Sequence, residues 1–66
     1  MTTTVTDAAA LPQLLTLPRA AEILGVSLKT LRRRIEAGDL PVIRDGRVVR
    51  VHPGDLARYV ASRRNL

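Results

Sequence analysis

Two short helices joined by a tight turn are predicted by residues 16–38, TLPRAAEILGVSLKTLRRRIEAG. Thr16 and Ser27 are residue types that cap helix amino termini, because their side-chain oxygen accepts a backbone N–H that has no partner in the helix. Gly25 and Gly38 suit the two carboxyl ends, because glycine adopts the left-handed conformation at little cost. The first helix is therefore expected to end before Gly25, and the second to run from Leu28 until Gly38.

Apolar residues recur at helical spacing in both segments, which predicts that each helix packs one side against the rest of the protein. In the first helix, the expected apolar stripe consists of Ala20, Ile23 and Leu24. In the second helix, it consists of Leu28, Leu31 and Ile35. Helices this short are marginal in isolation, so they must pack on each other and on the rest of the domain.

The solvent side of the second helix is strongly basic. At about 100° per residue, the side chains opposite the apolar stripe are those of Lys29, Thr30, Arg33 and Ala37. Arg32 and Arg34 flank them, and the three adjacent arginines repel one another with only Glu36 nearby as a counter-charge. A solvated helix face is the plain alternative, but the charge and the preceding turn together favour an anionic partner.

A β-hairpin is predicted over residues 40–51, because Asp45-Gly46 separates two β-prone runs and Asp-Gly is a strong hairpin signal. If Arg44 pairs with Arg47 across this turn, one face carries Leu40, Val42, Val49 and Val51 and packs on the helices. The other face then carries Ile43, Val48 and Arg50. Two like charges paired at the tip are unfavourable, and a bound anion would relieve them.

A third helix is expected to start at His52-Pro53-Gly54-Asp55, with an apolar stripe of Leu56, Tyr59 and Val60. We interpret His52 as a helix-start residue rather than as a metal ligand or a catalytic base. The fold class is therefore mainly α with a small β-hairpin. Residues 1–14 are expected to form a flexible arm, and residues 15–66 a single folded domain.

Composition narrows the classes of function. The chain has 66 residues, no cysteine and one histidine, so we expect no disulfide, no metal site and no cofactor. No nucleophile–base pair, carboxylate pair or glycine-rich phosphate loop is evident, which argues against an enzyme. The formal net charge is +5, which favours a polyanionic partner. No apolar stretch is long enough for a membrane span and no signal peptide is recognisable, so a cytoplasmic location is expected.

The two helices form a helix-turn-helix unit, and the hairpin is its wing. The second helix of such a unit enters the DNA major groove with its amino-terminal residues against the base edges. We therefore expect base contacts from Lys29, Thr30 and Arg33, and phosphate contacts from Ser27, Arg32, Arg34 and Arg50. The wing residues Arg44, Gly46 and Arg47 are expected at the neighbouring backbone or minor groove. Ile43 and Val48 are candidates for a protein–protein contact.

The order of motifs resembles that of excisionase-type winged-helix domains. The resemblance begins with residues 15–27 and continues with Thr30-Leu31-Arg32, Gly38-Asp39-Leu40-Pro41, Gly46-Arg47-Val48-Val49-Arg50-Val51 and Asp55-Leu56. The segment around Gly25-Val26-Ser27 is also similar to MerR-type regulators, which share the fold. By this resemblance, the recognition region contains Ser27, Lys29, Thr30, Arg32 and Arg33, and the wing contains Arg44, Gly46 and Arg47. We expect no counterpart of the long dimerisation helix of MerR-type regulators.

The resemblance implies an excisionase, or recombination directionality factor, of a phage or integrative element. Such proteins bind repeated DNA sites in neighbouring copies, bend the duplex and direct an integrase toward excision. Free in solution, we expect a monomer; in the cell, we expect it on the nucleoid. A small winged-helix transcriptional regulator is the alternative, and a protein-interaction module for an acidic partner is a third interpretation from a different class.

Overall fold

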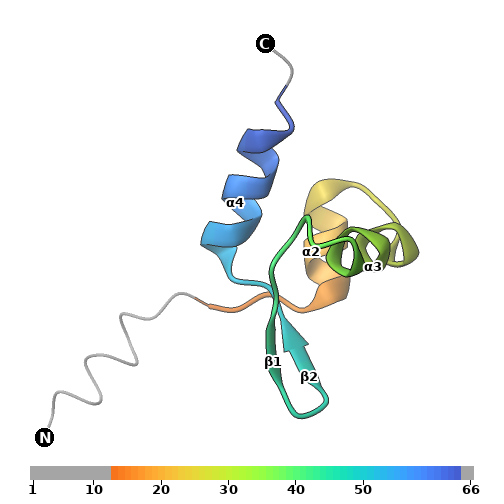
Figure 1. The fold of residues 1–66 in the computed structure, drawn as a ribbon, viewed down its shortest axis with the longest axis vertical. Helices are drawn as coiled ribbons and strands as arrows, with labels where there is room; N and C mark the ends of the chain where they lie inside the picture. Colours follow the sequence, from red (N-terminus) through yellow and green to blue (C-terminus); the bar gives the residue numbers. More distant parts are fainter. Residues whose placement is uncertain (1–12, 65–66) are drawn as a thin grey trace, which may run out of the picture.

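The computed structural model describes residues 13–64 and contains three helices and one two-stranded antiparallel hairpin in this range (Figure 1). In chain order, the elements are α2 (Leu17–Leu24), α3 (Leu28–Glu36), β1 (Ile43–Asp45), β2 (Val48–Arg50) and α4 (Pro53–Ser62). Apart from its last two residues, the predicted flexible arm lies outside the described residues.

The predicted helix ends are confirmed. Thr16 Oγ1 accepts the backbone N–H of Arg19 at 3.2 Å, and Gly25 leaves α2 with φ of 73°. At the end of α3, Gly38 likewise has φ of 83°, although the helix stops one residue earlier than predicted, with Ala37 as its C-cap. Both glycines have the left-handed conformation that lets a helix end abruptly, and at Gly25 this sets the short turn between α2 and α3.

Six residues form the buried core, and they come from the three helices and from the segments on either side of the hairpin: Ala20, Ala21, Leu31, Leu40, Val51 and Leu56. Half-buried apolar side chains pack around them, including Leu28 and Ile35 of α3 and Val42 beside the hairpin. The predicted buried stripe of α3 is therefore confirmed. No side-chain nitrogen or oxygen in the described residues is buried without a hydrogen-bond partner.

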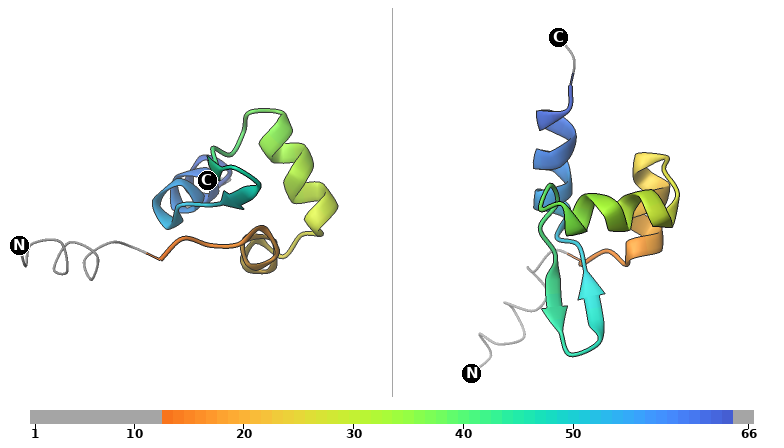
Figure 2. Two further views of the ribbon diagram at one scale, coloured as in Figure 1. Left: turned by 90° about the horizontal axis from the view of Figure 1, so that it is seen from below. Right: turned by 45° about the vertical axis from the view of Figure 1, so that its right-hand side comes forward.

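Two predicted core residues are wrong. Ile23 of α2 is 49% exposed, because the helix buries the face made by Leu17, Ala20, Ala21 and Leu24 instead. Its two alanines are 0% and 4% exposed, and such small side chains allow close packing of a helix. Val60 of α4 is 43% exposed, because the second half of α4 extends away from the body of the domain (Figures 1 and 2).

The hairpin forms as predicted, but its register differs by two residues. Asp45 pairs with Val48 and Arg44 pairs with Val49, so Gly46 and Arg47 make the two-residue loop. Gly46 has φ of 62°, and a glycine at the first loop position is what a type II′ turn requires. The expected Arg44–Arg47 pair is therefore absent. The assignment of residues to the two faces survives, because side chains alternate with a period of two.

An unpredicted contact joins the start of α2 to the end of the hairpin. The backbone N–H groups of Leu15 and Val51 donate to each other's carbonyls, both at 2.8 Å, in an antiparallel bridge. Val51 is fully buried at this point. The hairpin base is thereby attached to the segment that leads into α2, and this fixes the hairpin beside the helices (Figure 1).

The predicted winged helix-turn-helix architecture is confirmed. In Figure 2, α3 crosses the molecule beside α2, while the hairpin extends from one side of the domain and α4 from the other. None of the helices within residues 13–64 combines the length and apolar character that a membrane span requires.

Candidate nucleic-acid interface

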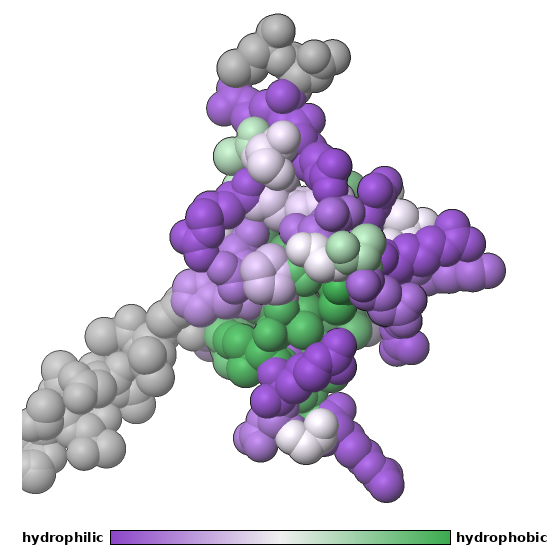
Figure 3. All heavy atoms as spheres, in the orientation of Figure 1, coloured by the Kyte–Doolittle hydropathy of each residue, from purple (hydrophilic) through white to green (hydrophobic). Residues whose placement is uncertain are grey.

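The outer surface of α3 carries a row of exposed cations. Lys29, Arg32 and Arg33 are exposed and line one shallow hollow together with Leu28 and Glu36. Their spacing on a helix capped at Ser27 places Lys29 in the first turn and the arginines in the second. The predicted basic face of α3 is therefore present, and long hydrophilic side chains project from this side of the molecule in Figure 3.

The hairpin extends this basic surface. Arg32 of α3 and Arg44 of β1 line the same hollow between the two elements, with Val49 also in its wall. Arg44 reaches this position because it pairs with Val49, and so shares the face of the hairpin that is turned toward the helices. Arg47 is exposed in the loop at the hairpin tip, where Figure 3 shows hydrophilic side chains extending from the domain.

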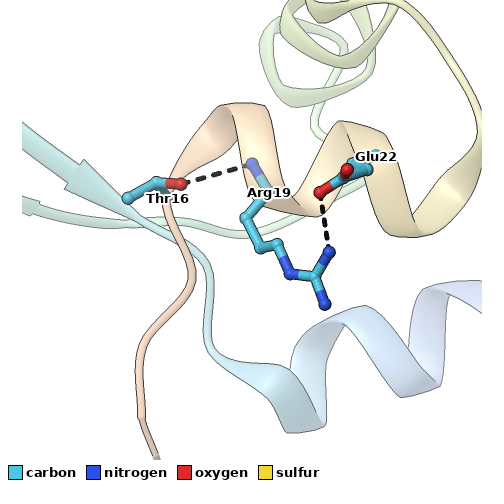
Figure 4. A network of polar contacts seen from close by, with 3 residues as sticks. All are labelled: Thr16, Arg19 and Glu22. Carbon is cyan, nitrogen blue, oxygen red and sulfur yellow. Dashed lines mark hydrogen bonds and ion pairs between the residues drawn. The ribbon is translucent and has the colours of Figure 1, made fainter.

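Ion pairs elsewhere leave this surface positively charged. The three ion pairs among residues 13–64 are Arg19–Glu22, Arg58–Asp55 and Arg63–Asp39. Figure 4 shows the first of them, at 2.6 Å, beside the Thr16 cap of α2. Such exposed pairs contribute little to stability. Three of the five acidic side chains in this range are thus paired with arginines of α2, of α4 and of the C-cap of α4. The arginines of α3 and of the hairpin form no ion pair within residues 13–64.

The amino terminus of α3 holds Thr30 through a pair of hydrogen bonds. Ser27 Oγ accepts the backbone N–H of Thr30 at 3.1 Å, and the Ser27 hydroxyl donates to Thr30 Oγ1 at 3.0 Å. Thr30 is half-buried, whereas Lys29 and Arg33 are exposed. With its oxygen already accepting a hydrogen bond, the Thr30 hydroxyl keeps its own proton for donation. Sequence reasoning identified the cap but not this coupling, for which the Ser-x-x-Thr spacing is the available signal.

Residues 14–64, well over half of the chain, match the family described as the helix-turn-helix domain. The chain belongs to this family. A search of curated proteins gives no significant match. A helix-turn-helix domain implies sequence-specific DNA binding, with α3 in the position of the recognition helix.

Two predicted contacts of this helix-turn-helix domain lie at the border of the basic surface or away from it. Arg34 lines a groove on the side of α3 that is turned toward α4, and it also lines a hollow with Thr30 and Arg33. Arg50 is half-buried on the outer face of the hairpin, and its guanidinium donates to the Val49 carbonyl at 2.9 Å. Ile43 and Val48 share that outer face and are 40% and 47% exposed.

The single histidine of the helix-turn-helix domain caps α4, as predicted. His52 Nδ1 accepts the backbone N–H of Gly54 at 2.8 Å, and Pro53 occupies the first helical position. Within residues 13–64, no group of three or more potential metal-ligating side chains is clustered.

Replacing Ser27 with alanine should destabilise the helix-turn-helix domain by about 0.5–2 kcal/mol, because the Thr30 N–H at the start of α3 loses its acceptor. The free energy of unfolding from urea titrations measures this cost. Ser62→Ala is the matched control, since Ser62 is exposed at the last residue of α4 and its hydroxyl donates to the Tyr59 carbonyl. Equal destabilisation by the two substitutions would contradict the capping role of Ser27.

Proposed function

We propose that this helix-turn-helix domain is an architectural DNA-binding protein that acts as an excisionase. It binds repeated sites in neighbouring copies, distorts the duplex and directs an integrase toward excision. The observation that carries the proposal is that Arg32 of α3 and Arg44 of the hairpin line one hollow, which also contains Glu36, so that the basic face of α3 adjoins the hairpin. The resemblance of residues 15–56 to excisionase-type domains gives that surface its biological role.

In this mode, α3 enters the major groove and the hairpin follows the adjacent backbone or minor groove. Lys29 and Arg33 contact base edges, and Thr30 donates its hydroxyl proton to a base acceptor. Phosphates are held by the cap of α3 and by flanking arginines, namely Ser27, Arg32 and Arg50. Arg34, which was expected to join them, is instead turned toward α4. In the hairpin, Arg44 and Arg47 neutralise backbone charge, and Gly46 permits the turn that presents them.

Arg50 needs one adjustment to reach a phosphate. Its guanidinium donates to the Val49 carbonyl, so this weak local bond has to be exchanged for the charge-assisted bond to phosphate. The exchange is favourable because a hydrogen bond between two charged groups is stronger than one to a neutral carbonyl.

Several copies on one site are expected because a single module covers little DNA. A domain of this size buries about 600–1,000 Å² on DNA, which is at the low end for specific complexes. Contacts between neighbouring copies raise the effective affinity for repeated sites. Ile43 and Val48, both exposed on the outer hairpin face, are the residues that we assign to this contact.

This function needs no catalytic group and no cofactor. The integrase performs the chemistry. The helix-turn-helix domain contributes binding energy that offsets the cost of distorting the duplex. The site of action is the nucleoid, in the cytoplasm.

Capture of sheared genomic DNA at moderate salt, followed by sequencing, tests the proposal. We expect spaced direct repeats beside an integrase attachment site, and binding that weakens steeply as salt rises. Promoter sites in their place would identify a transcriptional regulator that uses the same surface. Enrichment of nothing above random sequence would remove the excisionase role. The double variant Arg32→Ala/Arg44→Ala should lose this capture, whereas Arg58→Ala, an exposed arginine of α4 paired with Asp55, should retain it.

A further inference from the structure

An apolar groove lies between α3 and α4, on the side of α3 away from the hairpin. It has a volume of about 430 Å³, and Leu24, Val26, Tyr59 and Val60 supply its apolar wall. Val26 and Val60 are 37% and 43% exposed. The groove exists because the second half of α4 stands away from the domain beside α3 (Figure 2). Leu24 and Tyr59 are half-buried, so Val26 and Val60 are the most exposed part of this wall.

Cations border this apolar wall. Arg34 of α3 and Arg63 and Arg64 at the end of α4 line the groove. Arg63 is held by an ion pair with Asp39 at 3.1 Å, and its guanidinium lies 4.9 Å from the centre of the Tyr59 ring. Arg34 and Arg64 form no ion pair within the described residues and are exposed. The groove therefore presents an apolar strip between positive edges.

We infer that this groove binds an amphipathic segment of a partner protein, with apolar side chains on the strip and acidic side chains toward Arg34 and Arg64. Amphipathic helices bind apolar grooves in this way, through side chains spaced three and four residues apart. The inference does not depend on the excisionase role. It requires only that bound DNA leaves the apolar strip and Arg64 accessible.

The composition of the groove favours a protein segment over DNA. A phosphate backbone would pair with Arg34 and Arg64 but would gain nothing from exposed Val26 and Val60. The surface that we assign to DNA meets the groove at Thr30 and continues to the opposite flank of α3, where Arg32 adjoins the hairpin. A DNA-bound copy would thus keep the apolar strip of Val26, Tyr59 and Val60 open for a protein.

Selection from a displayed library of random 12-residue peptides, with wild-type protein bound to duplex DNA as the bait, tests this inference. We expect enriched peptides with apolar residues at helical spacing and flanking Asp or Glu. Affinities of the enriched peptides are then measured by fluorescence anisotropy. Val60→Ser should weaken binding about three- to tenfold through lost apolar contact, and Arg64→Ala about two- to fivefold through lost charge.

The controls separate this surface from the others. Val48→Ser alters an equally exposed valine on the hairpin and should leave peptide affinity unchanged. Val60→Ser should leave the affinity for duplex DNA unchanged. Failure of the excisionase proposal would appear in the DNA-capture experiment, whereas failure of the groove proposal would appear in the peptide affinities. Circular dichroism verifies that each variant is folded.

Three outcomes would overturn the inference. The first is a selection that enriches no acidic amphipathic consensus. The second is peptide binding that is insensitive to Val60→Ser, which would locate the site elsewhere. The third is displacement of the peptide by duplex DNA, which would assign Arg34 and Arg64 to the DNA interface.

Discussion

Replacing Arg33 with alanine is expected to weaken binding to the captured DNA site by about 1–3 kcal/mol, which is a loss of about 5- to 150-fold in affinity. Arg33 is exposed on the side of α3 opposite buried Leu31, so its guanidinium is available to fork onto a guanine edge. The loss should appear at one base position, where the variant accepts other bases. Binding of a set of single-base site variants, measured by anisotropy, gives this profile.

Arg32→Ala is the comparison that makes this result specific. Arg32 lies between α3 and the hairpin, beside Arg44, in the position assigned to phosphate. Its replacement should weaken binding to specific and random DNA alike. It should also reduce by about one the number of counterions released on binding, as measured from the salt dependence of the affinity. Arg19→Ala removes an exposed arginine that is paired with Glu22 in α2, and it should change neither measurement. Equal losses for Arg33→Ala on specific and random DNA would disprove the division between base and phosphate contacts.

Leu31→Ala is expected to destabilise the fold by about 2–5 kcal/mol, the largest effect that we predict for any single substitution. Leu31 is 0% exposed and is one of the three largest fully buried side chains, with Leu40 and Val51. A domain this small rarely has more than about 3–5 kcal/mol of total stability, so much of the variant should be unfolded at 25 °C. Thermal and urea unfolding followed by circular dichroism measure the change.

Ile23→Ala is the matched control for this substitution. It also shortens an aliphatic side chain on a helix of the same unit, but Ile23 is 49% exposed. We expect a change within about 0.5 kcal/mol, as is usual for surface positions. A wild-type unfolding midpoint for Leu31→Ala, or a larger loss for Ile23→Ala, would show that the burial pattern of the two helices is wrong.

Local signals in the sequence were sufficient for most of the fold. Thr16, Ser27 and His52 cap helices where their side chains predict it, and Gly25 ends α2 in the left-handed conformation. The alternation of Leu40, Val42, Val49 and Val51 also predicted the inner face of the hairpin. These features depend on neighbouring residues alone, which is why a single sequence reveals them.

Features that depend on distant residues were missed. Helical spacing predicted Ile23 as a core residue of α2, but the helix buries Ala21 instead, because the buried face depends on how α2 packs against α3. The Asp-Gly signal located the turn but did not distinguish a loop at Asp45-Gly46 from one at Gly46-Arg47. For the candidate site, helical spacing gave the basic face of α3. Only the fold brings Arg32 beside Arg44, because this contact depends on how the hairpin packs against α3.

The bridge between Leu15 and Val51 makes the base of the hairpin a mechanical anchor for the chain that enters the domain. Two reciprocal backbone hydrogen bonds of 2.8 Å hold that chain to the wing before it reaches the first helix. A movement of the hairpin base would therefore also displace Leu15 and the start of α2. A fluorophore or a fused protein at that point would report wing displacement, and a tether there would restrain it.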